Sequence, residues 1–156
     1  SAVSIMVGQR LGAGQMEEAR DVDRKLIFLT EVIHVIIGTA MILTSSLIPK
    51  LYNVGPDVQD LTRQMLIIAG IALPIHSFAH VTYFTIRSGG RTVITFFFDA
   101  LYTWVVTVTA AFLLTRFTDW SIVQIYLCVQ FIDVLKVVIG LIMLRSDFWA
   151  RNVVND

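Results

Sequence analysis

The chain has 156 residues, of which 56% are apolar and 15% charged, and its mean hydropathy is +0.73. Soluble domains contain about 45–50% apolar and about 25% charged residues, so this composition argues against a soluble globular domain. The formal net charge is zero, and nothing in it indicates a nucleic-acid partner. We therefore predict an all-α membrane protein.

The first 25 residues precede the first apolar block. Residues 1–12 have the character of a helix end whose beginning lies upstream, and residues 13–25 that of a cytoplasmic linker. Gly12 and Gly14 are suited to ending a helix and reversing the chain. The charges that follow alternate in sign, which predicts a short helix running into the apolar block. Gly8, Gly12 and Gly14 do not form a GxGxxG motif, so nucleotide binding is not indicated.

Four apolar blocks follow, and each is about 22 residues long. A helix of that length spans roughly 30 Å at ~1.5 Å per residue, which is the thickness of the hydrocarbon layer. Strands of a membrane barrel would alternate over ~10 residues, and no such alternation is present. The sequence therefore predicts four transmembrane helices at residues 26–48, 65–86, 93–115 and 122–144.

The positive charges are distributed unevenly over the two predicted sides of the membrane. Eight basic residues fall on the side of the two ends, and three fall on the other side. By the positive-inside rule, this predicts a multi-pass protein of the plasma (inner) membrane with both ends in the cytoplasm. The eight are Arg10, Arg20, Arg24, Lys25, Arg87, Arg91, Arg145 and Arg151, and the three are Lys50, Arg63 and Arg116.

The third predicted span contains a carboxylate, Asp99. A charge in the bilayer costs ~2.5–3.5 kcal/mol on insertion scales, so it is seldom kept without a use. Threonines recur on the same helical face at spacings of three and four, namely Thr92, Thr95, Thr103 and Thr107. We predict that Asp99, Thr103 and Thr107 handle a coupling cation, Na⁺ or H⁺. The alternative is a structural carboxylate that hydrogen-bonds to a neighbouring helix.

The other spans also contain polar groups. Gln130, Asp133 and Lys136 lie at i, i+3 and i+6 of the fourth span, where Asp133 and Lys136 are expected to pair along one face. Such a pair either holds helices together or contributes to gating or substrate contact. The three residues are therefore candidates for the substrate cavity or its gating.

The second span contains Pro74, which is expected to kink its helix. His76 and His80 share a face at i, i+4. That spacing suits a metal, but only two ligands are evident, so we predict cavity lining or helix packing and no metal site. Glu31 and His34, near the start of the first span, are further candidates for proton handling.

Three segments resemble the multidrug and toxic compound extrusion (MATE) transporters, and together they cover essentially the whole chain. The first is Val7–Gly14 followed by Glu17–Arg20, the second Ile86–Thr92 leading into Phe96–Asp99 and Trp104, and the third Val129–Lys136 with Trp149 and Arg151–Asn152. The resemblance implies twelve helices in two lobes. This chain would then be a partial C-terminal lobe, with the end of helix eight and helices nine to twelve, and its partners would be the N-terminal lobe and helix seven.

The resemblance also implies a function. MATE transporters export drugs and organic cations by antiport with Na⁺ or H⁺, without a resident cofactor, and they are not enzymes. Acidic residues of the C-terminal lobe bind the coupling cation in several members, and Asp99 matches that role by residue type. Three other functions stay open: a flippase for lipid-linked saccharides, a scaffold that acts only through helix packing, and an intramembrane enzyme, for which His76 and His80 are the only hint.

Overall fold

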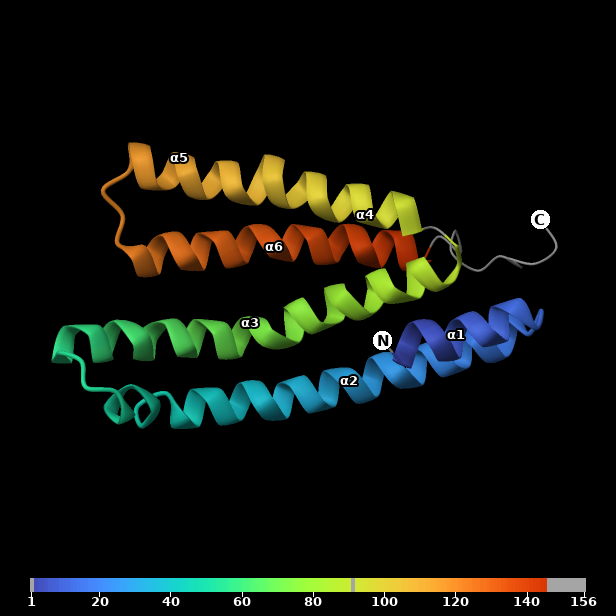
Figure 1. The fold of residues 1–156 in the computed structure, drawn as a ribbon, viewed down its shortest axis with the longest axis horizontal. Coiled ribbons are helices and arrows are strands. Elements are labelled where there is room, and N and C mark those ends of the chain that lie inside the picture. Colours follow the sequence, from blue (N-terminus) through green and yellow to red (C-terminus); the bar gives the residue numbers. More distant parts are fainter. Residues whose placement is uncertain (1, 91, 146–156) are drawn as a thin grey trace.

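The computed structural model describes residues 2–90 and 92–145, and the described chain is helical apart from short connections. Figure 1 shows the long helices side by side in one layer, in the order α2, α3, α6 and the continuous α4–η2–α5. The elements in chain order are α1 (Ala2–Gly12), α2 (Met16–Thr44), the 3-10 helix η1 (Ile48–Leu51), α3 (Pro56–Ser88), α4 (Thr92–Leu101), the π-helical segment η2 (Tyr102–Val108), α5 (Thr109–Phe117) and α6 (Ile122–Arg145).

Four helices of the described chain are long and apolar enough to cross a membrane: Met16–Thr44, Pro56–Ser88, Thr95–Phe117 and Ile122–Ile142. They correspond to the four predicted spans. Few of their apolar side chains are buried within the chain, and rings such as Phe28 and Phe131 are more than 70% exposed. Exposed apolar surface on this scale suits lipid rather than water as the surrounding medium. The predicted all-α membrane fold is confirmed.

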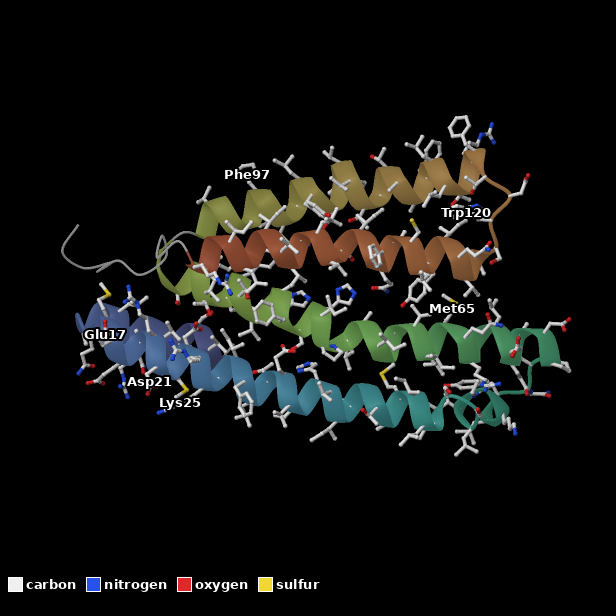
Figure 2. The ribbon with its side chains drawn as sticks, turned by 180° about the vertical axis from the view of Figure 1, so that it is seen from behind. Glu17, Asp21, Lys25, Met65, Phe97 and Trp120 are labelled. Atoms are coloured by element: carbon white, nitrogen blue, oxygen red, sulfur yellow. The ribbon has the colours of Figure 1, made fainter. Side chains whose placement is uncertain are left out.

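The first spanning helix begins before the apolar block, as the predicted helix running into that block implies. α1 ends at Gly12, and the chain turns through Gly14, whose φ of 75° is costly for residues with a side chain. α2 then begins at Met16, so the polar linker and the apolar block form one continuous helix. Figure 2 shows Glu17, Asp21 and Lys25 together at this end of the molecule and Trp120 at the opposite end.

The end of the same helix differs from the predicted span. α2 ends at Thr44, whereas the predicted span continued to Ile48. The hydroxyl groups of Thr44 and Ser45 donate to the carbonyl oxygens of Ala40 and Ile42, both at 2.7 Å. These side chains satisfy carbonyls in the last turn of the helix.

α2 and α3 approach each other backbone to backbone. A Cβ added to Gly38 would collide with the carbonyl group of Gly70, and one added to Gly70 would lie 2.8 Å from the carbonyl oxygen of Gly38. Only glycine fits on both sides of such a contact, in the way that small residues allow close helix packing in membranes. This contact fixes the separation of α2 and α3.

The largest apolar cluster lies where α1 packs against the start of α2 and the end of α3. Val7, Leu11 and Ile86 are fully buried in it. Beside this cluster, the hydroxyl of Thr85 donates a hydrogen bond to the buried carboxylate of Asp23. Asp23 lies in the polar start of α2, where no sequence pattern distinguished it from the neighbouring charged residues.

α3 contains Pro74 and changes direction in its middle (Figure 1). Proline removes one backbone hydrogen bond and displaces the preceding turn, which is a common cause of a helix bend. The two halves of α3 therefore serve different neighbours. The second half carries Tyr83, which packs towards the site described next.

Candidate functional site

The candidate site lies between α6 and the helix formed by α4 and η2. The ammonium group of Lys136 on α6 forms an ion pair with Asp99 of α4. The Lys136 side chain is 15% exposed and that of Asp99 is 40% exposed. The lysine is therefore the inner partner of the pair, and part of the carboxylate surface remains open to an incoming group.

The Lys136 ammonium has further neighbours on two other segments. It lies 3.4 Å from Thr103 Oγ1, to which it donates. It also lies 5.8 Å from the ring centres of both Tyr83 on α3 and Tyr102 in η2. Cations are attracted to aromatic faces within about 6 Å. One carboxylate, one hydroxyl and two rings thus form a cation-binding environment, occupied here by a cation of the chain itself.

Asp133 has a different partner from the one predicted. Within the described residues, Lys136 pairs with Asp99 across the helices and not with Asp133 on its own helix. Asp133 Oδ1 instead accepts a hydrogen bond from Thr107 Oγ1 at 3.2 Å. The expectation of an intrahelical Asp133–Lys136 pair was wrong because α4 and η2 place other polar partners against this face of α6.

The backbone of α6 is held by two tyrosine hydroxyls at the same level. Tyr102 donates to the carbonyl oxygen of Ile132 at 2.6 Å, and Tyr83 donates to that of Lys136 at 3.4 Å. These carbonyls belong to the helix turns that carry Asp133 and Lys136. The two tyrosines therefore position the site and surround its cation. No sequence pattern pointed to either tyrosine, although Tyr102 lies one turn beyond Asp99 on the same helix.

Of the threonines predicted to share one helical face, only some lie at the site. Thr103 and Thr107 contact Lys136 and Asp133, whereas Thr95 is buried against the Arg87 guanidinium, with 3.3 Å from Arg87 Nε to Thr95 Oγ1. The side chain of Thr92 lies outside the described residues. Thr103 and Thr107 lie in the π-helical segment η2, whose wider turn shifts the side chains that follow. Such segments are frequent at functional sites, and no signal in the sequence indicated this one.

The two histidines of α3 have different surroundings. His76 Nε2 donates a hydrogen bond to Gln130 Oε1 on α6, whereas His80 is exposed. Nowhere in residues 2–90 and 92–145 do three or more His, Cys, Asp or Glu side chains converge as metal ligands would. His76 and Gln130 thus link α3 to α6, and the roles predicted for them and for His80 stay predictions.

A second polar group connects α2 and α3. His34 Nδ1 lies 2.7 Å from the carbonyl oxygen of Thr30 and 2.9 Å from Ser77 Oγ. Because a carbonyl only accepts, the proton of this ring is on Nδ1. The oxygen of the Ser77 hydroxyl therefore faces the ring N–H of His34. Glu31 lines an apolar cavity of about 410 Å³ between α2, α3 and α6.

The two carboxylates and one ammonium give the site between α4, η2 and α6 a formal charge of −1. A net charge of −1 attracts cations, and the carboxylate and hydroxyl oxygens are ligands of the type that hard cations take. Asp99, Thr103, Thr107, Asp133 and Lys136 are brought together here, as candidate residues for ion coupling or gating.

The comparisons with known proteins agree with this architecture. No curated protein and no solved structure matches the chain. A family model described as MatE matches residues 1–118, which is more than half of the chain and includes Asp99 and the two threonines of η2. Members of this family are transporters rather than enzymes. A helical membrane protein that matches the family over this length belongs to it: the chain is a member of the MatE family of multidrug and toxic compound extrusion transporters.

Proposed function

We propose that the protein is a secondary active antiporter that exports drugs or organic cations in exchange for Na⁺ or H⁺, and that Asp99 is the group that couples the two movements. The observation that carries the proposal is a partly exposed carboxylate within a spanning helix, whose charged partner is one flexible lysine. A carboxylate at this depth is costly unless its charge is used.

The chemistry of antiport follows from one site with one negative charge. Na⁺ or a proton neutralises Asp99, and an organic cation is attracted by the same charge when the ion has left. Since the site attracts one monovalent cation at a time, ion and substrate exclude each other. Release of one is then the condition for binding of the other, as exchange requires.

The placement in the cell is part of the proposal. The basic residues gather at the end where α2 begins and where α3 ends, which favours this end for the cytoplasmic side of the plasma membrane. The exposed apolar surface of the described helices suits contact with lipid and with the other helices of a twelve-helix transporter. No nucleic-acid partner and no resident cofactor are part of this proposal.

The test is ethidium efflux from cells that express the full-length transporter with Asp99→Asn. This variant keeps the size of the side chain and removes its charge. We expect efflux to fall at least about tenfold, the change in rate that ~1.4 kcal/mol produces. Asp119→Asn is the matched control, because Asp119 is exposed in the connection between α5 and α6. Equal efflux in both variants would refute the role of Asp99.

The flippase alternative is less favoured. A lipid pyrophosphate needs uncompensated cationic groups, whereas Lys136 already forms an ion pair with Asp99. The scaffold alternative predicts that Asp99, Asp133 and Lys136 all tolerate neutral replacement provided that the protein inserts, and the Asp99→Asn experiment tests this directly.

A further inference from the structure

The site contains its own competing cation. The Lys136 ammonium occupies the place next to Asp99 where a transported cation would bind, between the rings of Tyr83 and Tyr102. We propose that Lys136 is a tethered competitor, which leaves Asp99 for Asp133 when the transported cation arrives and returns when that cation leaves. This inference rests on the proposed function and adds the residue that sets how tightly the cation binds.

The geometry provides a second carboxylate for the lysine. Asp133 precedes Lys136 by three residues on α6, a spacing at which oppositely charged side chains of a helix meet. Asp133 Oδ1 is held at present by the hydroxyl of Thr107 at 3.2 Å, a neutral partner that an ammonium can replace. The lysine therefore has two acceptors, and one is available when a cation binds the other.

The surroundings suit a small movement of the ammonium. The rings of Tyr83 from α3 and Tyr102 from η2 both lie 5.8 Å from it, within the range in which a cation is attracted to an aromatic ring. Their hydroxyls are bound to the carbonyl oxygens of Lys136 and Ile132, which fixes the turn of α6 while the side chain moves. Thr103, at 3.4 Å, is a neutral group to which the ammonium donates.

The exposed fractions of the two side chains indicate the side from which a cation reaches the pair. Asp99 is 40% exposed and Lys136 15% exposed, so an incoming cation reaches Asp99 from the open side while the lysine holds it from the inner side. With the lysine on Asp99, the Thr107 hydroxyl holds Asp133, and with the lysine on Asp133, the transported cation binds Asp99. The charge of the site itself stays at −1, and no carboxylate is left alone in the membrane, where it would be costly.

The experiment measures ethidium transport by the full-length protein in proteoliposomes. An imposed Na⁺ gradient at fixed pH, or a pH gradient without Na⁺, drives it, and the half-saturating Na⁺ or proton concentration is determined. Lys136→Gln removes the cation that competes for Asp99, and we expect it to lower the half-saturating concentration about tenfold. Asp133→Asn removes the alternative acceptor and is expected to raise it. Lys136→Arg retains the charge and is expected to move the value back from that of Lys136→Gln towards that of the native protein.

A double variant separates competition from net charge. Asp133→Asn with Lys136→Gln leaves the site at −1, as in the native protein, but without a tethered cation. Competition predicts that the double variant keeps a low half-saturating concentration. A return to the native value would show that Lys136 acts only through net charge, and would overturn the proposal. Lys50→Gln is the control, because Lys50 is exposed in η1.

Some variants can bind cations without transporting ethidium, so cation binding at Asp99 is also measured directly. Dicyclohexylcarbodiimide modifies protonated carboxyl groups, and mass spectrometry reports its addition to Asp99. In Lys136→Gln, we expect a lower Na⁺ concentration to protect Asp99, or labelling to persist to higher pH. Unchanged protection in Lys136→Gln overturns this inference, whereas unchanged ethidium efflux in Asp99→Asn overturns the proposed function itself.

Discussion

Two contacts between neighbouring helices differ in chemistry, since one joins glycine backbones and the other, where we propose exchange, joins charged and polar side chains. α2 and α3 touch through the backbones of Gly38 and Gly70, with no space for one added carbon. α6 touches α4 and η2 through polar side chains: Lys136 pairs with Asp99, and Thr107 donates to Asp133. The first contact has one geometry, and the second has several acceptors for one cation. The difference indicates which interface serves stability and which serves exchange.

The physical reason lies in what each contact leaves unsatisfied when it changes. Separating Gly38 from Gly70 loses close packing that no other pair replaces, because helix association in lipid depends on such packing. Moving Lys136 from Asp99 to Asp133 replaces one ion pair by another. Substitutions at the first contact should therefore lower stability, and those at the second should change transport more than stability.

The largest loss of stability is expected at the α2–α3 contact. Gly38→Val inserts a branched side chain against the carbonyl group of Gly70 and should cost ~3 kcal/mol of unfolding free energy, at the upper end for overpacking. Unfolding in mixed detergent micelles measures this. Gly55→Ala is the matched control, because a Cβ at Gly55 meets nothing within 4 Å. Equal stability of both variants would contradict the close contact.

A smaller loss is expected where α2 and α3 meet near α1. Thr85→Val removes the hydroxyl that donates to the buried Asp23, and should cost about 2 kcal/mol because the carboxylate keeps its burial and loses a partner. The measurement is again unfolding in mixed micelles.

Thr82→Val is the control for this prediction. Thr82 is as fully buried as Thr85 and lies on the same helix, but within the described residues its hydroxyl has no hydrogen-bond partner. Valine should therefore be neutral or stabilising there. If Thr82→Val and Thr85→Val lose the same stability, the hydrogen bond to Asp23 contributes nothing.

The smallest effect on stability is expected at the exchangeable contact. Thr107→Val removes the donor to Asp133 and should cost about 0.6 kcal/mol, the average for hydrogen bonds between membrane helices. The half-saturating cation concentration for transport should fall, because Asp133 without its hydroxyl donor pairs more readily with Lys136. Asp99 then becomes available at a lower cation concentration. Thr115→Val, which loses only a bond to the Ala111 carbonyl, should leave the cation dependence unchanged. The same cation dependence in both variants would argue against exchange of the lysine.

Hydropathy was sufficient to predict the four spanning helices, because their length and apolar content depend on sequence alone. The alternating charges also predicted a helix that runs into the first apolar block, whereas the predicted end of the span at Ile48 lies beyond the end of α2 at Thr44. α2 already begins at the polar Met16 segment and ends at Thr44, where the hydroxyls of Thr44 and Ser45 donate to carbonyls of its last turn. A hydropathy profile alone does not reveal where the helix begins and ends, since these positions depend on local polar interactions.

The sequence predicted most residues of the candidate site but not which of them contact each other. Asp99, Asp133 and Lys136 stood out because charges are rare in apolar blocks, yet the partner of Lys136 depended on which helix faces which. Tyr83 and Tyr102 gave little signal, because tyrosine is common in membrane helices for other reasons. The π-helical turns of η2, which set the direction of Thr107, are a property of packing that no residue pattern revealed.

The most direct test of the central claim is ethidium uptake into proteoliposomes with the full-length protein, under an imposed Na⁺ or pH gradient and without one. The claim that Asp99 couples the two movements predicts that a gradient accelerates uptake by the native protein, whereas Asp99→Asn transports equally slowly with and without it. Acceleration by the gradient in Asp99→Asn, to the extent seen in the native protein, would contradict the claim.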